Sequence, residues 1–260
     1  MIVRIVLLFK MVILAIERVW PRRRFRHGVL NRWSGNGGLF AVNLAVVALV
    51  FPPGTATAMA WYCRENDIGL LNQWAGAPGW LALPLAFVAV DLSMWANHWL
   101  MHRFDFLWRA HQVHHSDLEL DVSTSLRFHP FETVFTVTVR MLAVAAIGAP
   151  LLAALAYGVV LDLMNTTSHA SLPIPERLDA ALRWLLVTPD YHRVHHSAAP
   201  EMNRNYAVIL PVWDRLLGTY QAQPKKGHLD MEIGLPDRRD DRSLHALALL
   251  LLPFRSLRNG

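Results

Sequence analysis

The sequence predicts an all-α integral-membrane protein with about four to five membrane helices and a helical cap on the cytoplasmic side. The 260 residues are 53% hydrophobic and only 17% charged, and their mean hydropathy is +0.25, which is apolar for a soluble protein. The apolar residues form long runs rather than the alternating pattern of strands. A chain of this length fits one catalytic unit without a second appended domain.

The first apolar run, Ile2 to Trp20, contains the charged residues Arg4, Lys10 and Glu17. These charges predict a weak span or an interfacial anchor, and the run lacks the small-residue cleavage site of a signal peptide. The basic segment Trp20-Pro-Arg-Arg-Arg-Phe-Arg26 follows it. A basic cluster beside an apolar run marks the cytoplasmic side by the positive-inside rule, although a basic loop without topological meaning is the alternative.

The later apolar runs predict two membrane hairpins. Leu39 to Trp61 and Trp80 to Trp99 are separated by a short polar stretch and form an out-and-back pair. Phe131 to Thr166 is long enough for a second hairpin, with Gly148-Ala-Pro150 as its turn. Both hairpins return to the cytoplasm on this topology, so every histidine cluster is expected at or beyond a cytoplasmic span end. Leu244 to Phe254 predicts a short interfacial helix.

Composition limits the partners and the metal ligands. The formal net charge is +5 and the isoelectric point is near 9.8, but the arginines stand beside apolar runs, which favours membrane lipids over nucleic acid as the partner. Cys63 is the single cysteine, which excludes a disulfide framework and a thiolate metal cage. Any metal must therefore be bound through nitrogen or oxygen, and the 13 histidines are the candidates.

Three histidine clusters lie between residues 98 and 196. The first has the spacing i, i+4, which places both imidazoles on one face of a helix. The second and third share the spacing i, i+3, i+4, which predicts two equal half-sites. Crowded, buried imidazoles persist best when metal ions take up their lone pairs. The clusters are His98 and His102; His111, His114 and His115; and His192, His195 and His196.

A fourth element follows at the end of the second hairpin. His169 stands there, and Asn165 precedes it by one helical turn, where it can bind a metal through a water. His169 raises the candidate ligands to nine histidines, too many for one four- to six-coordinate ion, so two metals are predicted. His129 precedes Pro130, which favours an extended or turn conformation, and we expect His129 to bind metal or to support a ligand.

Three aspartates stand near the candidate ligands. Asp91 and Asp162 each lie seven residues before a histidine, two turns away on the same helical face, and Asp190 lies two residues before another. We expect these carboxylates to accept imidazole N–H groups, with pairing to an arginine or a polar helix contact as the alternative. The sequence lacks the Glu-x-x-His pairs of soluble di-iron bundles and the His-Glu-x-x-His of zinc proteases, so the ligand set is expected to be nitrogen.

The clusters, together with Arg127-Phe-His-Pro130, Asn205-Tyr206 and Trp213-Asp-Arg-Leu-Leu-Gly-Thr219, resemble the fatty acid hydroxylase and sterol desaturase superfamily over residues 85 to 220. The resemblance implies an integral-membrane enzyme with two iron ions that uses O2 and two electrons to hydroxylate or desaturate an unactivated C–H bond of a lipid. One departure is Asn165, which stands where some fatty acid hydroxylases have a further histidine. We divide the chain into an N-terminal membrane-anchoring region (1–84), a fatty acid hydroxylase-like catalytic domain (85–220) and a C-terminal tail (221–260).

The sequence indicates that electrons come from another protein. It has no G-x-G-x-x-G motif after a strand and no haem-binding or cysteine-rich iron–sulfur segment, so a separate donor of the ferredoxin or cytochrome type, with its reductase, is expected. We favour hydroxylation over desaturation, of a fatty acyl, sterol or related lipid. The alternatives are a membrane metal transporter or metal-binding protein and a di-zinc hydrolase, which metal identity and oxygen dependence would separate.

Overall fold

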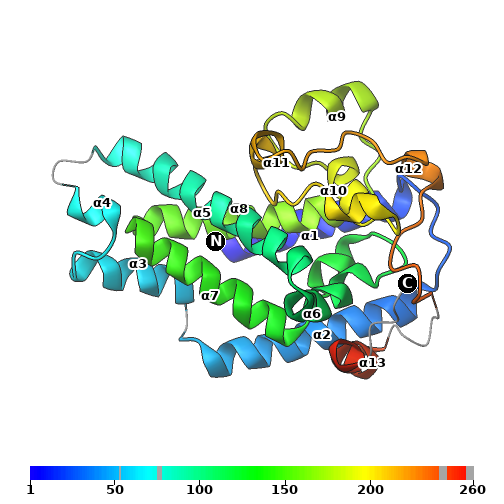
Figure 1. The fold of residues 1–260 in the computed structure, drawn as a ribbon, viewed down its shortest axis with the longest axis horizontal. Helices are drawn as coiled ribbons and strands as arrows, with labels where there is room; N and C mark the ends of the chain where they lie inside the picture. The colour runs from blue at the N-terminus through cyan, green and yellow to red at the C-terminus, as the bar shows by residue number, and fades with distance from the viewer. Residues whose placement is uncertain (53, 75–77, 240–244, 256–260) are drawn as a thin grey trace.

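The computed structural model of the protein describes residues 1–52, 54–74, 78–239 and 245–255, which fold into helices and connecting loops (Figure 1). The β pairing in this part of the chain is one isolated bridge between Ser197 and Ile233. The predicted all-α class is therefore confirmed.

The longer helices are α1 (Ile2–Val19), α2 (Val29–Val50), α3 (Thr55–Glu65), α5 (Gly79–Arg103), α6 (Asp105–His115), α7 (Pro130–Ile147) and α8 (Leu151–His169). The shorter ones are α4 (Leu70–Gln73), η1 (Val122–Leu126), α9 (Glu176–Leu182), α10 (Pro189–His195), η2 (Pro200–Asn203), α11 (Val212–Leu216), α12 (Gly227–Asp230), α13 (Ala246–Leu251) and η4 (Leu252–Phe254).

Within the described residues, four segments are long and apolar enough to cross a membrane. They are Val29–Gln73, which runs through α2, α3 and α4, and the helices α5, α7 and α8. This agrees with the expected four to five membrane helices. The charged helix α1 is not among the four, but it lies against α8, where Lys10 Nζ is 2.7 Å from Asp162 Oδ1.

The main core lies where α5, α7 and α8 pack together. Small side chains such as Ala86 of α5 and Ala153 and Ala154 of α8 are buried there, and they let the helices approach closely. On the outside of the same bundle, Leu142 of α7 and Leu152 of α8 are more than 60% exposed. Apolar side chains on both faces of a helix are the pattern of a segment that packs on protein and on lipid.

The hairpin turn between α7 and α8 is at the predicted place. Gly148 ends α7 with φ +67°, a left-handed conformation that glycine adopts without a Cβ clash. A Cβ added to Gly69 would lie 2.2 Å from the Gly148 nitrogen. The loop between α3 and α4 and the turn between α7 and α8 therefore pack backbone to backbone at the end of the bundle opposite α6 and α10 (Figure 1).

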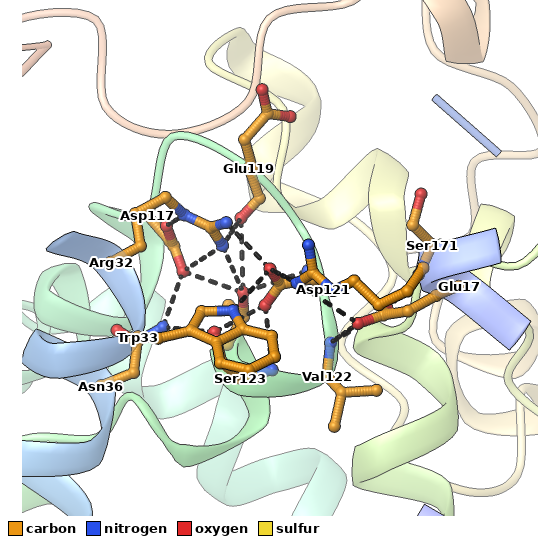
Figure 2. A network of polar contacts seen from close by, with 12 residues as sticks. Glu17, Arg32, Trp33, Asn36, Asp117, Glu119, Asp121, Val122, Ser123 and Ser171 are labelled. Atoms are coloured by element: carbon orange, nitrogen blue, oxygen red, sulfur yellow. Dashed lines mark hydrogen bonds and ion pairs between the residues drawn. The ribbon is translucent and has the colours of Figure 1, made fainter. Parts of the chain in front are cut away.

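A buried polar network fixes the other end of the bundle (Figure 2). Arg32 of α2 is fully buried, and its Nε and Nη1 lie 2.6 Å from Asp117 Oδ1 and 2.9 Å from Asp121 Oδ2. Arg18 of α1 also reaches Asp121, at 3.0 Å. Both aspartates lie in the loop after α6. Removing one partner of such a buried pair is costly because it leaves an uncompensated charge, so α1 and α2 hold this loop in place.

The predicted helix over Leu244 to Phe254 corresponds to α13 and η4, and Leu244 itself lies outside the described residues. Leu249 and Leu252 are buried in a small core with Leu39 of α2 and Val113 of α6. Leu247 and Phe254 are exposed. The segment is therefore an amphipathic piece packed on the bundle beside the second histidine cluster.

Candidate metal centre

The structure brings all nine predicted histidines together in two groups. In each group the ligand nitrogens lie within 4.8 Å of one another, so each set can converge on one ion. The residues come from the ends of α5 and α8, from α6, and from α10 with the residue after it. The first group is His98, His102, His111, His115 and His195, and the second is His114, His169, His192 and His196.

The two groups are unequal and intermixed, so the expectation of two equal half-sites is wrong. Of the second cluster, His111 and His115 join the first group and His114 joins the second; of the third cluster, His195 is separated in the same way from its neighbours. Residues i and i+4 are about 40° apart around a helix, whereas i and i+3 differ by about 60° in the other direction. The second and third clusters therefore each direct their i, i+4 pair to one focus and their i+3 residue to the other.

In most of these imidazoles, Nδ1 faces away from the group and is hydrogen-bonded, which sets the orientation of the ring. Nδ1 of His98 lies 2.8 Å from the Tyr206 carbonyl oxygen, and Nδ1 of His195 lies 2.8 Å from that of Arg204. In the second group, Nδ1 of His169 lies 2.7 Å from the Asn165 carbonyl oxygen. A carbonyl oxygen only accepts, so these Nδ1 atoms carry the proton and the inward Nε2 atoms carry the lone pair.

The inward nitrogens face one another at distances that suit a shared ion. Nε2 of His111 is 3.2 Å from Nε2 of both His98 and His115, and Nε2 of His169 is 3.0 Å from that of His114 and 3.1 Å from that of His192. Lone pairs held this close repel unless a cation lies between them. Nitrogens bound at about 2.1 Å to one ion, at angles of about 90–109°, lie about 3.0–3.4 Å apart.

Two further nitrogens that face into the groups also indicate a bound metal ion. Nε2 of His102 and Nε2 of His195 are buried and have no hydrogen-bond partner. Buried polar atoms are almost always paired, so an unpaired nitrogen aimed at a cluster of other nitrogens is explained by a metal. The residues present therefore fit two ions, with five and four imidazole ligands.

Burial keeps four of these imidazoles in the neutral form. Burial lowers the pKa of His195 to about 3, and the neighbouring His111 adds to the effect. Burial likewise lowers the pKa of His114, His115 and His196, and the adjacent imidazoles lower it further. Neutral imidazole is the form that binds metal.

Glu132 is a functional candidate that the sequence analysis missed. It lies in the first turn of α7, is 4% exposed, and its Oε1 is 2.7 Å from Nδ1 of His111. A carboxylate acceptor fixes the imidazole orientation and raises its basicity toward a metal. The available signal was its position in Arg127-Phe-His-Pro-Phe-Glu132, three residues after His129.

His129 and Asn165 lie outside both groups. His129 Nδ1 accepts the Phe131 N–H at the start of α7, at 3.2 Å, and its Nε2 is 3.3 Å from the Leu250 carbonyl oxygen. The Asn165 side chain donates to the Ser125 carbonyl oxygen at 3.0 Å. Asn165 nevertheless acts on the second group, because its main-chain oxygen receives the His169 Nδ1 hydrogen bond.

The three aspartates have partners other than the imidazoles of the two groups. Asp91 accepts hydrogen bonds from Tyr157, Leu210 and Trp213. Asp162 pairs with Lys10. Asp190 pairs with Arg22, with Arg193 and, at 3.9 Å, with His228. The expected contacts to imidazole N–H groups are replaced by ion pairs and polar helix contacts, because two helical turns separate Asp91 and Asp162 from the histidine ends of α5 and α8.

A second buried arginine, Arg127, positions one of the histidines through its main chain. Arg127 is fully buried, and its guanidinium donates to Val113, Asn36 and Ser116 at 2.8–2.9 Å. Its carbonyl oxygen lies 3.1 Å from Nδ1 of His114. The arginine of the Arg-Phe-His-Pro motif is therefore a structural residue that positions a candidate ligand.

A cavity of about 290 Å³ opens beside the two groups, between α5, α7 and α8. Histidines of both groups form one part of its wall, among them His98 and His169. Further along α7 and α8 the wall includes Val137, Arg140 and Gly158. The volume is near the lower end of the range of small-molecule sites. The cavity therefore extends from the candidate metal centre along helices that can span a membrane.

Comparison with known proteins identifies the sequence pattern. The sequence model of the fatty acid hydroxylase family matches residues 83–219, more than half of the chain. These residues include every histidine of both groups. No solved structure matches the chain significantly.

Individual relatives cover a similar part of the chain. It is 33% identical to an ornithine lipid hydroxylase of Rhizobium tropici over 144 residues, 55% of this chain and 43% of that protein. It is 33% identical to the alkylglycerol monooxygenase of Danio rerio over 140 residues, 53% and 30% of the two chains. It is 30% identical to a very-long-chain aldehyde decarbonylase of Oryza sativa over 132 residues, 47% and 19% of the two chains. The chain thus spans less than half the length of these relatives.

Proposed function

The chain belongs to the fatty acid hydroxylase family, and on that premise we propose that it is a membrane-bound di-iron oxygenase that hydroxylates an unactivated C–H bond of a lipid. The observation that carries the proposal is the convergence of nine imidazoles on two foci, eight of them from buried residues and one from the half-buried His102. Imidazole ligands suit iron, copper, nickel and zinc alike, so family membership selects iron among them.

The two groups would each hold one iron. Bound there, the pair would supply the activation of O2 and the removal of hydrogen from the C–H bond. One oxygen atom enters the product alcohol and the other leaves as water, which consumes two electrons and two protons. The protein contributes orientation: Glu132 and the Tyr206 carbonyl oxygen hold His111 and His98 through their Nδ1 atoms, while burial keeps bulk water away from the centre.

A lipid substrate is supported by the position of the cavity and by the relatives. The cavity extends from the histidines between α5, α7 and α8, each apolar and long enough to cross a membrane, so an alkyl chain can lie there. The names of two relatives describe an ornithine lipid hydroxylase and an alkylglycerol monooxygenase. Both names describe oxygenation rather than desaturation, in line with the favoured hydroxylation.

The orientation in the membrane and the source of electrons complete the proposal. Arg22 lies in the basic segment after α1 and binds Asp190 of α10 at 3.1 Å, so the basic segment and the third histidine cluster share one end of the molecule. By the positive-inside rule this end faces the cytoplasm. A separate ferredoxin- or cytochrome-type donor with its reductase would supply the electrons there.

The proposal is tested on the full chain purified anaerobically in detergent. We expect about two iron ions per chain by elemental analysis, Mössbauer spectra of iron-57 material that change on exposure to O2, and conversion of a lipid to its alcohol when a reducing system is added. Stoichiometric zinc in protein produced with ample iron, without an oxygen response, would contradict it. That outcome would favour the di-zinc hydrolase or the metal transporter.

A further inference from the structure

The wall of the cavity beside the candidate metal centre includes polar and charged side chains as well as apolar ones. Three polar side chains on its wall have a buried atom without a hydrogen-bond partner: Oδ1 of Asn97, Oε2 of Glu132 and Nε of Arg140. Such atoms are costly in a protein surrounded by lipid, where water does not satisfy them from outside. A polar group of the bound ligand would satisfy atoms that face the cavity.

Arg140 is the charged member of this set. In the part of the chain that the structure describes, its guanidinium makes no ion pair, whereas Asp162 on the opposite helix of the cavity wall already has Lys10 at 2.7 Å. Arginines within membrane spans are rare, face a cavity or the bundle interior, and mark substrate or ion pathways. The cavity wall therefore carries a positive charge that pairs with no carboxylate of the described residues.

The position of Arg140 sets the shape of the ligand that would reach it. Arg140 is eight residues after Glu132 on α7, about 12 Å along the helix axis. Side chains of a helix tilt toward its N-terminus, and for α7 that end adjoins His111. The Cα–Cβ bond of Arg140 therefore points toward the histidine end of α7. A ligand that touches both Arg140 and the histidines must be elongated.

We propose that Arg140 binds the anionic group, a carboxylate or a phosphate, of an elongated lipid whose other part reaches the histidine groups. This inference rests on the proposed function in one respect, that the cavity holds the substrate. A guanidinium matches both anions with two parallel hydrogen bonds, and the pair is strong in a site without bulk water. An uncharged ester would leave the Arg140 charge unpaired, so the cavity selects charged over uncharged lipids.

The experiment measures binding rather than turnover. Affinities of hexadecanoate, its methyl ester and hexadecyl phosphate are determined for the purified full chain in detergent under anaerobic conditions. We expect the wild type to prefer at least one charged probe over the ester by about tenfold or more, and the tighter of the two charged probes identifies the anion. Arg140→Gln should bring that preference close to unity while its affinity for the ester stays within about twofold.

Two control variants separate the loss of the Arg140 charge from a general disturbance of α7. Thr138 is at an exposed position of the same helix, so Thr138→Ala should keep the wild-type preference for the charged probe. Arg140→Lys keeps the charge but loses the planar fork, so it should retain a reduced preference even if the glutamine variant is unstable. Equal affinities of charged and uncharged probes in the wild type, or an unchanged preference in Arg140→Gln, would overturn the proposal. The absence of iron or of oxygen chemistry would leave this binding result unaffected.

Discussion

Glu132 and His111 form the contact that ties the membrane helix α7 to the candidate metal centre: Oε1 of Glu132 lies 2.7 Å from Nδ1 of His111. Nε2 of the same imidazole is the nitrogen that approaches both His98 and His115 at 3.2 Å. His111 therefore stands between a carboxylate on one side and the focus of the five-histidine group on the other. The carboxylate charge favours the positive charge that a bound ion would place on this ring.

The first prediction follows from this contact. Glu132→Gln should keep a side chain of the same size but remove the charge that stabilises the metal-bound imidazole, and it should weaken metal retention about 10- to 100-fold. Elemental analysis after dialysis against a chelator measures this loss. Thr133→Ser, on the next residue of α7, is the control and should retain metal as the wild type does. Unchanged retention in Glu132→Gln would show that the contact is only structural.

The second prediction tests the intermixed assignment of the clusters. His114 and His196 belong to the same group although they come from different clusters, whereas His114 and His115 are neighbours in different groups. The double variant His114→Ala/His196→Ala should therefore keep about one tightly bound ion per chain, held by five imidazoles. His114→Ala/His115→Ala should weaken both sites and keep less.

The control for this pair is His129→Asn, which keeps an acceptor at the start of α7 and lies outside both groups. It should bind about two ions. The opposite result would be one ion kept by His114→Ala/His115→Ala and both ions lost by His114→Ala/His196→Ala. Each cluster would then bind its own ion, and the assignment of the two groups would be wrong.

The sequence allowed the candidate ligands to be predicted but not their division into the two groups of the structure. Periodicity reports which residues share a helical face, and it identified His98 with His102 as a pair on one ion. It does not report how α6 and α10 are rotated relative to each other, and that rotation places His195 in the group of His111 and His115. The hairpin turn at Gly148 was predicted because glycine conformation is a local property.

Long-range polar contacts were the part that local patterns could not predict. Arg32 and Asp117 are 85 residues apart, and Asp91 joins Trp213 from 122 residues away. Nothing in the residues beside Arg32 distinguishes it from the other arginines of the N-terminal region. Spacing predicted that Asp91 shares a face with His98, but two helical turns put it too far along α5 to reach the imidazole. The division of the chain at residues 84 and 220 stays a prediction.

The third prediction concerns pH and Glu17 of α1. Glu17 is fully buried and accepts the N–H groups of Val122 and Ser171 at 3.0–3.2 Å. Burial raises its pKa from 4.5 to about 7, and the nearby Asp121 adds to the effect. Since the folded-state pKa is raised, the stability that this group contributes is fully present below about pH 4.5 and is lost as the pH rises through about 7.

Glu17→Gln should remove this dependence. Relative to the wild type, its thermal unfolding midpoint in detergent should improve as the pH rises from about 5 to about 8, by the equivalent of at most about 3 kcal/mol. Glu176→Gln, at an exposed position of α9, should show no such trend. A Glu17→Gln midpoint that falls relative to the wild type over the same range would reverse the sign and refute the explanation.

The fourth prediction concerns Asp214, a fully buried carboxylate. It accepts hydrogen bonds from Trp95 at 2.9 Å, Tyr191 at 2.6 Å and the Tyr206 N–H at 2.9 Å, and the Tyr206 carbonyl oxygen receives the Nδ1 hydrogen bond of His98. Asp214→Asn would place an amide N–H against these donors, at a cost of about 2–5 kcal/mol. We expect a lower unfolding midpoint and loss of metal from the five-histidine group first.

The test measures the unfolding midpoint in detergent and the metal content on the same sample. It shows whether metal is lost from the five-histidine group before the other. Asp237→Asn, a substitution at an exposed carboxylate, is the matched control and should change neither quantity. A destabilised Asp214→Asn protein that still holds its full metal complement would show that Asp214 stabilises the fold without positioning His98.

The fifth prediction tests whether the cavity is the lipid site at all, independently of Arg140. Gly158 of α8 lines the cavity, and a Cβ added there would meet nothing within 4 Å beyond the backbone of its own helix, so the Cβ of Gly158→Leu meets no neighbouring helix. Its side chain would occupy part of the roughly 290 Å³ of the cavity. We expect the affinity for hexadecanoate and for its methyl ester to fall by about tenfold or more. The metal content should not fall, and neither should the unfolding midpoint, because leucine has a higher helix propensity than glycine.

Gly158→Ala should have a much smaller effect on both affinities. If Gly158→Leu bound both lipids as tightly as the wild type, the lipid would bind elsewhere, and the assignment of this cavity as the substrate site would be wrong.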